Sequence, residues 1–232
     1  MKRFYKQASS LKTDEGYTIQ LDGKDAKTPS GILLIAPNKA VAEAVVSEWE
    51  AQEDTIDDES MPLTQILVTA IDRQRDRDDI TNQLADHIHT DLLCYRTEEP
   101  QVLADKQAEV WDPWLVWFKD MFGTKLKTTT ALEVVQQDPD LRSRIWNYAE
   151  ALDEHYFAIL HIVTSLSGSI ILALAFLEFD IDADTLFEAS ELEEIYHADL
   201  AGSPDPVVEK RQKAMRRDLE ASLQFMNLLD SE

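Results

Sequence analysis

The stretch "ILLIAPNKAVAEAVVSEW" (residues 32–49) marks the point where the chain changes from β structure to α structure. Up to Pro37 it is a short apolar run, which is typical of a buried strand closed by a proline. After Pro37 the apolar residues from Val41 to Trp49 recur at intervals of three and four, which indicates one face of a helix. Asn38 precedes this pattern and is a residue type that caps helices. The sequence therefore predicts a strand followed directly by a helix.

The residues before this stretch also have β character. "YTIQL" (17–21) alternates between apolar and polar residues, and "DG" (22–23) is a strong signal for a hairpin turn. "RFYKQ" (3–7) could form another strand. These patterns predict a small sheet at the N-terminus.

An acidic loop, "EDTIDDES" (53–60), follows this stretch, and the residues after the loop are mainly helical. Apolar periodicity predicts helices at residues 63–74, 78–95, 101–110, 112–122, 139–153, 155–179, 185–200 and 207–228. The expected fold class is therefore α+β. We expect a small β-rich N-terminal domain with one helix at residues 1–60, followed by a larger all-α C-terminal domain at residues 61–232.

The net charge limits the kinds of partner. The chain has 22 Lys and Arg residues against 45 Asp and Glu residues, a formal net charge of −23. Such a surface repels nucleic acids and anionic membranes and favours cationic partners. From Ile145 to Glu209 there is no Lys or Arg at all, which is typical of a solvated acidic face or of a docking surface for a basic partner.

The compartment is expected to be the cytoplasm. A single cysteine excludes an internal disulfide and fits a reducing environment. The opening residues "MKRFYKQASS" lack the apolar stretch of a secretory signal. The uncharged segment from His155 to Leu177 has nearly the length of a membrane span, but its acidic flanks and the interrupting "SLSGS" (165–169) favour a buried helix or helix pair. No membrane insertion is expected.

One segment, "HIHTDLLC" (87–94), has the composition of a metal site. On a helix, His87, Asp91 and Cys94 would share one face, and a metal-dependent enzyme using these three residues is the alternative hypothesis for function. A tetrahedral site needs a fourth ligand, and the sequence has no second His/Cys cluster. The other interpretation is a boundary helix in which Cys94 is a small buried apolar residue. This second interpretation is favoured, so no metal and no cofactor is expected.

Two further segments resemble functional sites without matching them fully. "DIDADTLFEASE" (180–191) has acidic residues at positions 1, 3, 5 and 12 of a calcium loop, but Thr185 occupies the position that requires glycine. This favours Asp184 as the N-cap of a helix that begins at Thr185.

In "WDPWLVW" (111–117) tryptophans recur every third residue, which is typical of a helix core and, less often, of a partner surface. The sequence contains no phosphate-binding loop and no nucleophile motif, so we expect a protein that is not an enzyme.

An ordered set of short motifs resembles a known family. The motifs are "LDG", "KTP", "EWEAQEDTI", "MPLTQI", "TAIDR", "TDLLCYR", "EEP", "WDPWLVW", "GSIILALA" and "EASELEEIY", and they run from about Arg3 to Gly202. Together they resemble the ATP-twelve family, the assembly chaperones of the F-type ATP synthase alpha subunit. Each motif alone is weak, whereas their order along most of the chain is specific.

The resemblance implies a function and a site. Family members are not enzymes; they bind the newly made alpha subunit and shield its surface until the beta subunit replaces them. The family's important acidic residue lies in a segment that here reads "LEEIYH" (192–197), so the resemblance implies client binding by Glu194 together with Glu193 and Tyr196. The chain departs from the family where His197 and Ala201 stand in place of Gln and Trp. A cytoplasmic, bacterial, monomeric chaperone is expected.

Overall fold

The computed structural model describes residues 1–202 and 205–231. Two compact units make up the chain. The first, called here the N-terminal unit, contains residues 1–76, a short segment at 154–158 and the C-terminal residues from Glu220 onward. The second, called the helical unit, contains residues 77–153 and 159–219. The predicted domain boundary at residue 60 stays a prediction.

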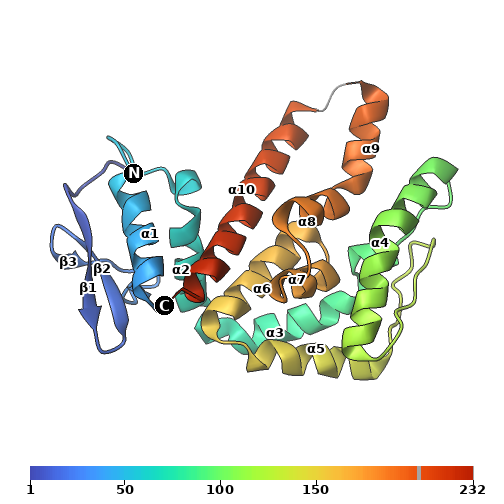
Figure 1. Cartoon of the computed structure of the whole chain (residues 1–232), viewed down its shortest axis with the longest axis horizontal. Coiled ribbons are helices and arrows are strands. Elements are labelled where there is room, and N and C mark those ends of the chain that lie inside the picture. The colour runs from blue at the N-terminus through green and yellow to red at the C-terminus, as the bar shows by residue number, and fades with distance from the viewer. Residues whose placement is uncertain (203–204, 232) are drawn as a thin grey trace. The chain divides into compact units, whose positions relative to one another are not determined.

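The N-terminal unit contains an antiparallel sheet around one central strand (Figure 1). Its strands are β1 (Ala8–Thr13), β2 (Gly16–Leu21), β3 (Lys24–Asp25) and β4 (Ile35–Ala36). β2 pairs with all three of the others. Asp22 and Gly23 have positive φ angles of 50° and 74° and form the two-residue turn between β2 and β3. The "DG" turn predicted from the sequence is therefore confirmed.

The helix predicted after Pro37 is also present, as α1 (Lys39–Glu50). The side chain of Asn38 accepts a hydrogen bond from the Val41 backbone N–H at 2.9 Å, which satisfies one of the donors left free at a helix start. Val41, Ala42 and Val45 are fully buried. α2 (Pro62–Asp72) follows in the same unit, and its first turn begins with a proline, which lacks the N–H that would be unpaired there.

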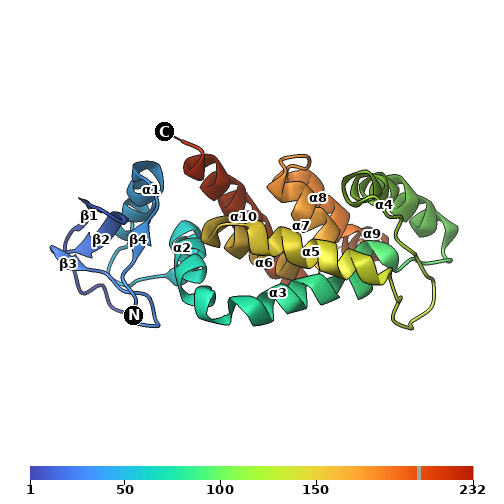
Figure 2. The ribbon, with the colours of Figure 1, turned by 90° about the horizontal axis from the view of Figure 1, so that it is seen from below.

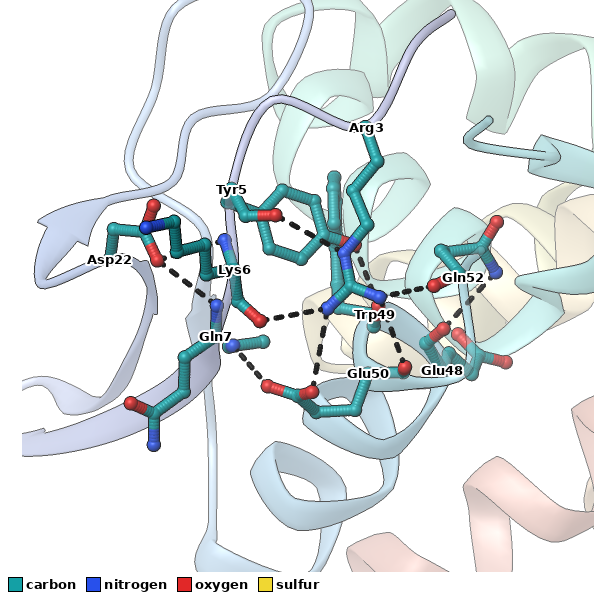
Figure 3. Close-up of polar contacts among 10 residues, drawn as sticks. Arg3, Tyr5, Lys6, Gln7, Asp22, Glu48, Trp49, Glu50 and Gln52 are labelled. Atoms are coloured by element: carbon teal, nitrogen blue, oxygen red, sulfur yellow. Dashed lines mark hydrogen bonds and ion pairs between the residues drawn. The ribbon is translucent and has the colours of Figure 1, made fainter. Parts of the chain in front are cut away.

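A strand was predicted as possible at residues 3–7, and this prediction was wrong. Side chains, rather than a neighbouring strand, bind the backbone groups of this segment (Figure 3). The Arg3 guanidinium donates to the carbonyls of Tyr5 at 3.2 Å, Lys6 at 3.1 Å and Gln52. The Asp22 carboxylate accepts from the backbone N–H groups of Lys6 and Gln7 at 2.9 and 3.0 Å. The first strand starts only after these contacts, at Ala8.

The remaining helices complete the predicted α+β fold, and this fold class is confirmed. They are α3 (Arg77–Asp86), α4 (Gln101–Phe122), α5 (Pro139–Ala151), α6 (Glu154–Ser167), α7 (Ile170–Leu177), α8 (Ala183–Ser190), α9 (Leu192–Ala201) and α10 (Pro206–Leu229). α3 and α5 run side by side in the helical unit (Figures 1 and 2). Every residue of α7 is buried, so this helix forms the centre of that unit's core.

Several predicted helix boundaries differ from the structure. The uncharged segment is divided at Gly168, which has a φ angle of 67°, and Ser169 caps α7 by accepting from the Leu172 N–H at 3.1 Å. The two helices expected at 101–122 are one helix that continues through Pro113. The helix expected at 185–200 is two, α8 and α9. In the parts of the chain that the structure describes, no helix has both the length and the apolarity that a membrane crossing requires.

Candidate functional site

The geometry assumed for the metal hypothesis is absent, because residues 87–94 do not lie on one helix. α3 ends at Asp86, and two short 3-10 turns follow at His87–His89 and Leu92–Cys94. Within residues 1–202 and 205–231 no group of three metal-ligating side chains comes together. The hypothesis of a metal-dependent enzyme using His87, Asp91 and Cys94 therefore loses its structural basis, whereas Cys94 is fully buried, as the other interpretation predicted.

Asp91 is instead a buried connector within the helical unit. Its carboxylate accepts hydrogen bonds from the N–H groups of Leu93 at 3.0 Å and Ile171 at 3.2 Å, and from the Ser169 hydroxyl at 3.0 Å. Burial raises the pKa of Asp91 to about 6, and these N–H donors act in the opposite direction. The side chain thus joins the 92–94 turn to the start of α7.

The carboxylates of the calcium-loop pattern also do not converge. Asp182, and not Asp184, caps α8, because its side chain accepts from the Thr185 N–H at 2.7 Å and the helix starts at Ala183. Asp184 pairs with Arg216 at 2.6 Å. Glu191 is buried and pairs with Arg211 at 2.5 and 2.7 Å. The N-cap prediction for Asp184 was therefore wrong, and the acidic residues hold helices together.

The polar members of the motifs that carry the family resemblance bind one another. The Glu48 carboxylate of "EW" accepts from the backbone N–H groups of Leu63 and Thr64 in "MPLT" at 2.8 and 2.7 Å. The following contacts join further motifs in pairs: Thr28 to Asp72 at 2.5 Å, Asp91 to Ser169 at 3.0 Å, Arg96 to Asp112 at 2.9 Å, and Trp111 Nε1 to the Ala189 carbonyl at 2.7 Å. Most of the signature therefore builds the scaffold.

The three residues assigned to client binding all lie on α9 but not on one face. Glu193 and Tyr196 are directed toward α4: Glu193 Oε1 accepts from Gln107 Nε2 at 2.5 Å, and Lys106 Nζ lies 5.5 Å from the centre of the Tyr196 ring. Glu194 lies one residue, or about 100°, further around the helix, and its charge contributes to the raised pKa of Arg211 on α10. The structure therefore brings Glu193 and Tyr196 together and separates Glu194 from them.

Glu193 and Glu194 are exposed and lie in the first turn of α9. The helix dipole favours carboxylates at this end, so the two charges are tolerated next to each other. The Glu194 carboxylate makes no hydrogen bond or ion pair with any other residue that the structure describes. Apart from its electrostatic interaction with Arg211, this exposed carboxylate is available to a cation on another protein.

A groove of about 670 Å³ lies beside α9, and sequence reasoning did not predict it. α4, α8, α9 and α10 line it, and Figure 1 shows α9 between α10 and α4. Its apolar lining consists of Val110, Phe187, Leu192 and Ile195, and Tyr196 also borders it. These residues come from helices far apart in the chain, so the only sequence signal for the groove was the apolar face of each helix taken separately.

A family model and a yeast relative both show that this sequence is similar to ATP12 proteins. The family described as ATP12 chaperone protein matches residues 2–119. The protein atp12, mitochondrial, of the fission yeast Schizosaccharomyces pombe is 24% identical over 234 residues, which cover 95% of this chain and 80% of the relative.

Two bacterial structures share the fold. The crystal structure of Atp12 from Paracoccus denitrificans has a TM-score of 0.88 and 32% identity, and the match covers 98% of this chain and 97% of that one. The Atu1473 protein of Agrobacterium tumefaciens has a TM-score of 0.90 and 31% identity, with coverage of 99% of this chain and 86% of that one.

Proposed function

The chain belongs to the ATP12 chaperone family, and on this premise we propose that it is an ATP-independent chaperone that binds the free alpha subunit of the F-type ATP synthase. In this role it prevents the alpha subunit from aggregating before the beta subunit joins. The observation that carries the proposal is the match to this family over half of the sequence and to the solved structure of Atp12 from Paracoccus denitrificans over nearly the whole chain.

The surface of α9 supports this proposal physically. An unassembled subunit exposes apolar surface, which is an aggregation hazard. A chaperone with a net charge of −23 keeps such a complex soluble through charge repulsion. The exposed carboxylate of Glu194 pairs with a Lys or Arg of the client, while Glu193 and Tyr196 contact the client at the α4 side of the helix. Since exposed ion pairs are weak, the beta subunit can displace the chaperone.

The proposed setting is the bacterial cytoplasm, with the chaperone acting as a monomer. The identities of 31–32% to the two bacterial proteins, against 24% to the yeast mitochondrial one, favour a bacterial member. The chaperone and a newly made alpha subunit would then share one compartment.

Co-expression tests this function. The alpha subunit of the same organism is produced with and without the chaperone, and its soluble fraction is measured. We expect the chaperone to raise this fraction and Glu194→Lys to lower it again, because the reversed charge repels the client's cation. Glu133→Lys is the matched control: Glu133 is also an exposed glutamate whose carboxylate has no hydrogen bond or ion pair to any described residue, and it belongs neither to α9 nor to the lining of the groove beside it. An alpha subunit that stays equally insoluble with and without the chaperone contradicts the proposal.

A further inference from the structure

The groove beside α9 is distinct from the position of Glu194. Its lining includes Leu192, Ile195 and Tyr196 of α9 but neither Glu194 nor Arg211. With 100° per residue, Glu194 lies about 160° around the helix from Leu192 and Tyr196 and about 100° from Ile195. The groove is therefore a separate surface, and its occupant has to be inferred from its own chemistry.

The cations at the rim of the groove are already engaged. Arg216 forms an ion pair with Asp184 at 2.6 Å, and its guanidinium lies 3.7 Å from the centre of the Phe187 ring. Lys213 pairs with Glu209 at 2.6 Å. The remaining cation, Lys106, lies against the Tyr196 ring, where the negative face of the ring stabilises it.

Two carboxylates at the same rim are free. Glu109 on α4 and Glu188 on α8 are exposed. Neither carboxylate makes an ion pair or hydrogen bond with any residue among 1–202 and 205–231. Against the one positive charge of Lys106, these two carboxylates leave the rim with a net negative charge. A complementary occupant therefore carries Lys or Arg beside its apolar residues.

The lining of the groove also limits the backbone conformation of an occupant. The groove is lined by helices, whose backbone N–H and C=O groups are paired within each helix. It therefore offers no strand edge to which an extended peptide could add. A segment that buries its backbone there has to satisfy its own hydrogen bonds, and a helix does so.

We propose that this groove binds an amphipathic helix of the alpha subunit, whose apolar face covers Val110, Leu192 and Ile195 and whose flanking Lys or Arg residues pair with Glu109 and Glu188. This inference rests on the proposed function and adds a second contact, on a different face of α9 from Glu194. Helix-in-groove recognition of this kind uses a few apolar anchors and charged flanks.

Peptide binding to the full-length chaperone tests the inference. Overlapping fluorescent 20-residue peptides are prepared that together cover the alpha subunit of the same organism, and binding is measured by fluorescence anisotropy at low and high salt. We expect the peptides that bind to be helical, apolar on one face and basic at its flanks. Binding falls with added salt, because the ion pairs are exposed.

Charge reversal identifies the site. The double variant Glu109→Lys/Glu188→Lys is expected to bind these peptides about tenfold more weakly, because two attractions become repulsions. The double variant Asp120→Lys/Glu133→Lys changes the net charge equally, at exposed carboxylates that are absent from the groove lining. It is expected to bind within about twofold of the unaltered chain. Circular dichroism melts check that both variants are folded.

A photo-crosslinking amino acid identifies the occupant directly. Placed at Ile195, it is expected to crosslink to a helix of the alpha subunit, whereas the same amino acid at Asp120 does not. Crosslinking to a second copy of this chain, or equal binding by both charge-reversal variants, overturns the inference. If no peptide binds but the chaperone still keeps the whole alpha subunit soluble, the groove proposal fails and the proposed function stands. If the alpha subunit is not kept soluble at all, the proposed function fails.

Discussion

Asp91 shows how a residue that suggests metal binding serves the core instead. Its carboxylate is fully buried and is surrounded by N–H and O–H donors from Leu93, Ser169 and Ile171. The sequence favoured an interpretation without a metal, and the structure shows the carboxylate bound by hydrogen-bond donors. The sequence could not show that two of the donors come from Ser169 and the first turn of α7, because these contacts join residues 78 to 80 positions apart.

The buried Asp91 carboxyl predicts a specific dependence of stability on pH. Its folded pKa is about 6, against an ordinary value of 3.8. Between these values the folded chain holds a proton that the unfolded chain has lost, so the free energy of unfolding falls as the pH rises from about 4 to about 6. Asp91→Asn removes this pH-dependent part of the free energy of unfolding, which is on the order of 3 kcal/mol at most. Urea denaturation of the unaltered chain and of Asp91→Asn across this pH range measures the difference. If the free energy of unfolding changes with pH equally in both, the prediction is contradicted.

At the scale of single elements, the turn between β1 and β2 depends on Gly16. Its φ angle is 138°, and a Cβ there would overlap the carbonyl oxygen of Ala36. Gly16→Ala is expected to lower the free energy of unfolding by about 3 kcal/mol or more. Gly23→Ala is the control, because Gly23 also has a positive φ but open space around it. For this variant we expect the free energy of unfolding to fall by about 1 kcal/mol. Equal losses in denaturant unfolding would show that the close approach to Ala36 is unimportant.

The helix α10 is joined to the α8–α9 corner by Arg211 and the buried Glu191. Arg211→Met leaves a buried carboxylate with only the Gln212 amide as a partner. Since Arg211 itself is half exposed, we expect a moderate loss of about 2 kcal/mol. The double variant Glu191→Met/Arg211→Met is expected to recover part of this loss, because no unpaired charge remains. A double variant that is less stable than Arg211→Met would exclude this explanation.

The elements differ in how far the sequence predicted them. The cap at Asn38, the Asp22–Gly23 turn and the helix after Pro37 were predicted because local residue preferences determine them. The break after α3 was missed because its cause is not local: the 92–94 turn is held by a side chain bound to α7. The same reason applies to the candidate site. "LEEIYH" could be located from the resemblance, whereas the groove beside it is assembled from four helices.

At the scale of the whole molecule, a net charge of −23 repels itself within the folded chain. Added salt screens this repulsion. Raising sodium chloride from low to physiological concentration is therefore expected to raise the melting temperature while weakening binding of the alpha subunit through Glu194 and the groove. Differential scanning calorimetry and binding measurements at the same salt concentrations check the two opposite trends. Binding that strengthens with salt would argue against a role for the acidic surface.

The most direct test of the central claim is the aggregation of purified alpha subunit, followed by light scattering after dilution from denaturant. With an equimolar amount of this chain and no nucleotide, we predict that scattering is largely suppressed and that a one-to-one complex is recovered by size-exclusion chromatography. An unrelated acidic protein of similar size and charge should leave the scattering unchanged. Scattering that rises equally with this chain and with that control, or suppression that requires ATP, would contradict the account.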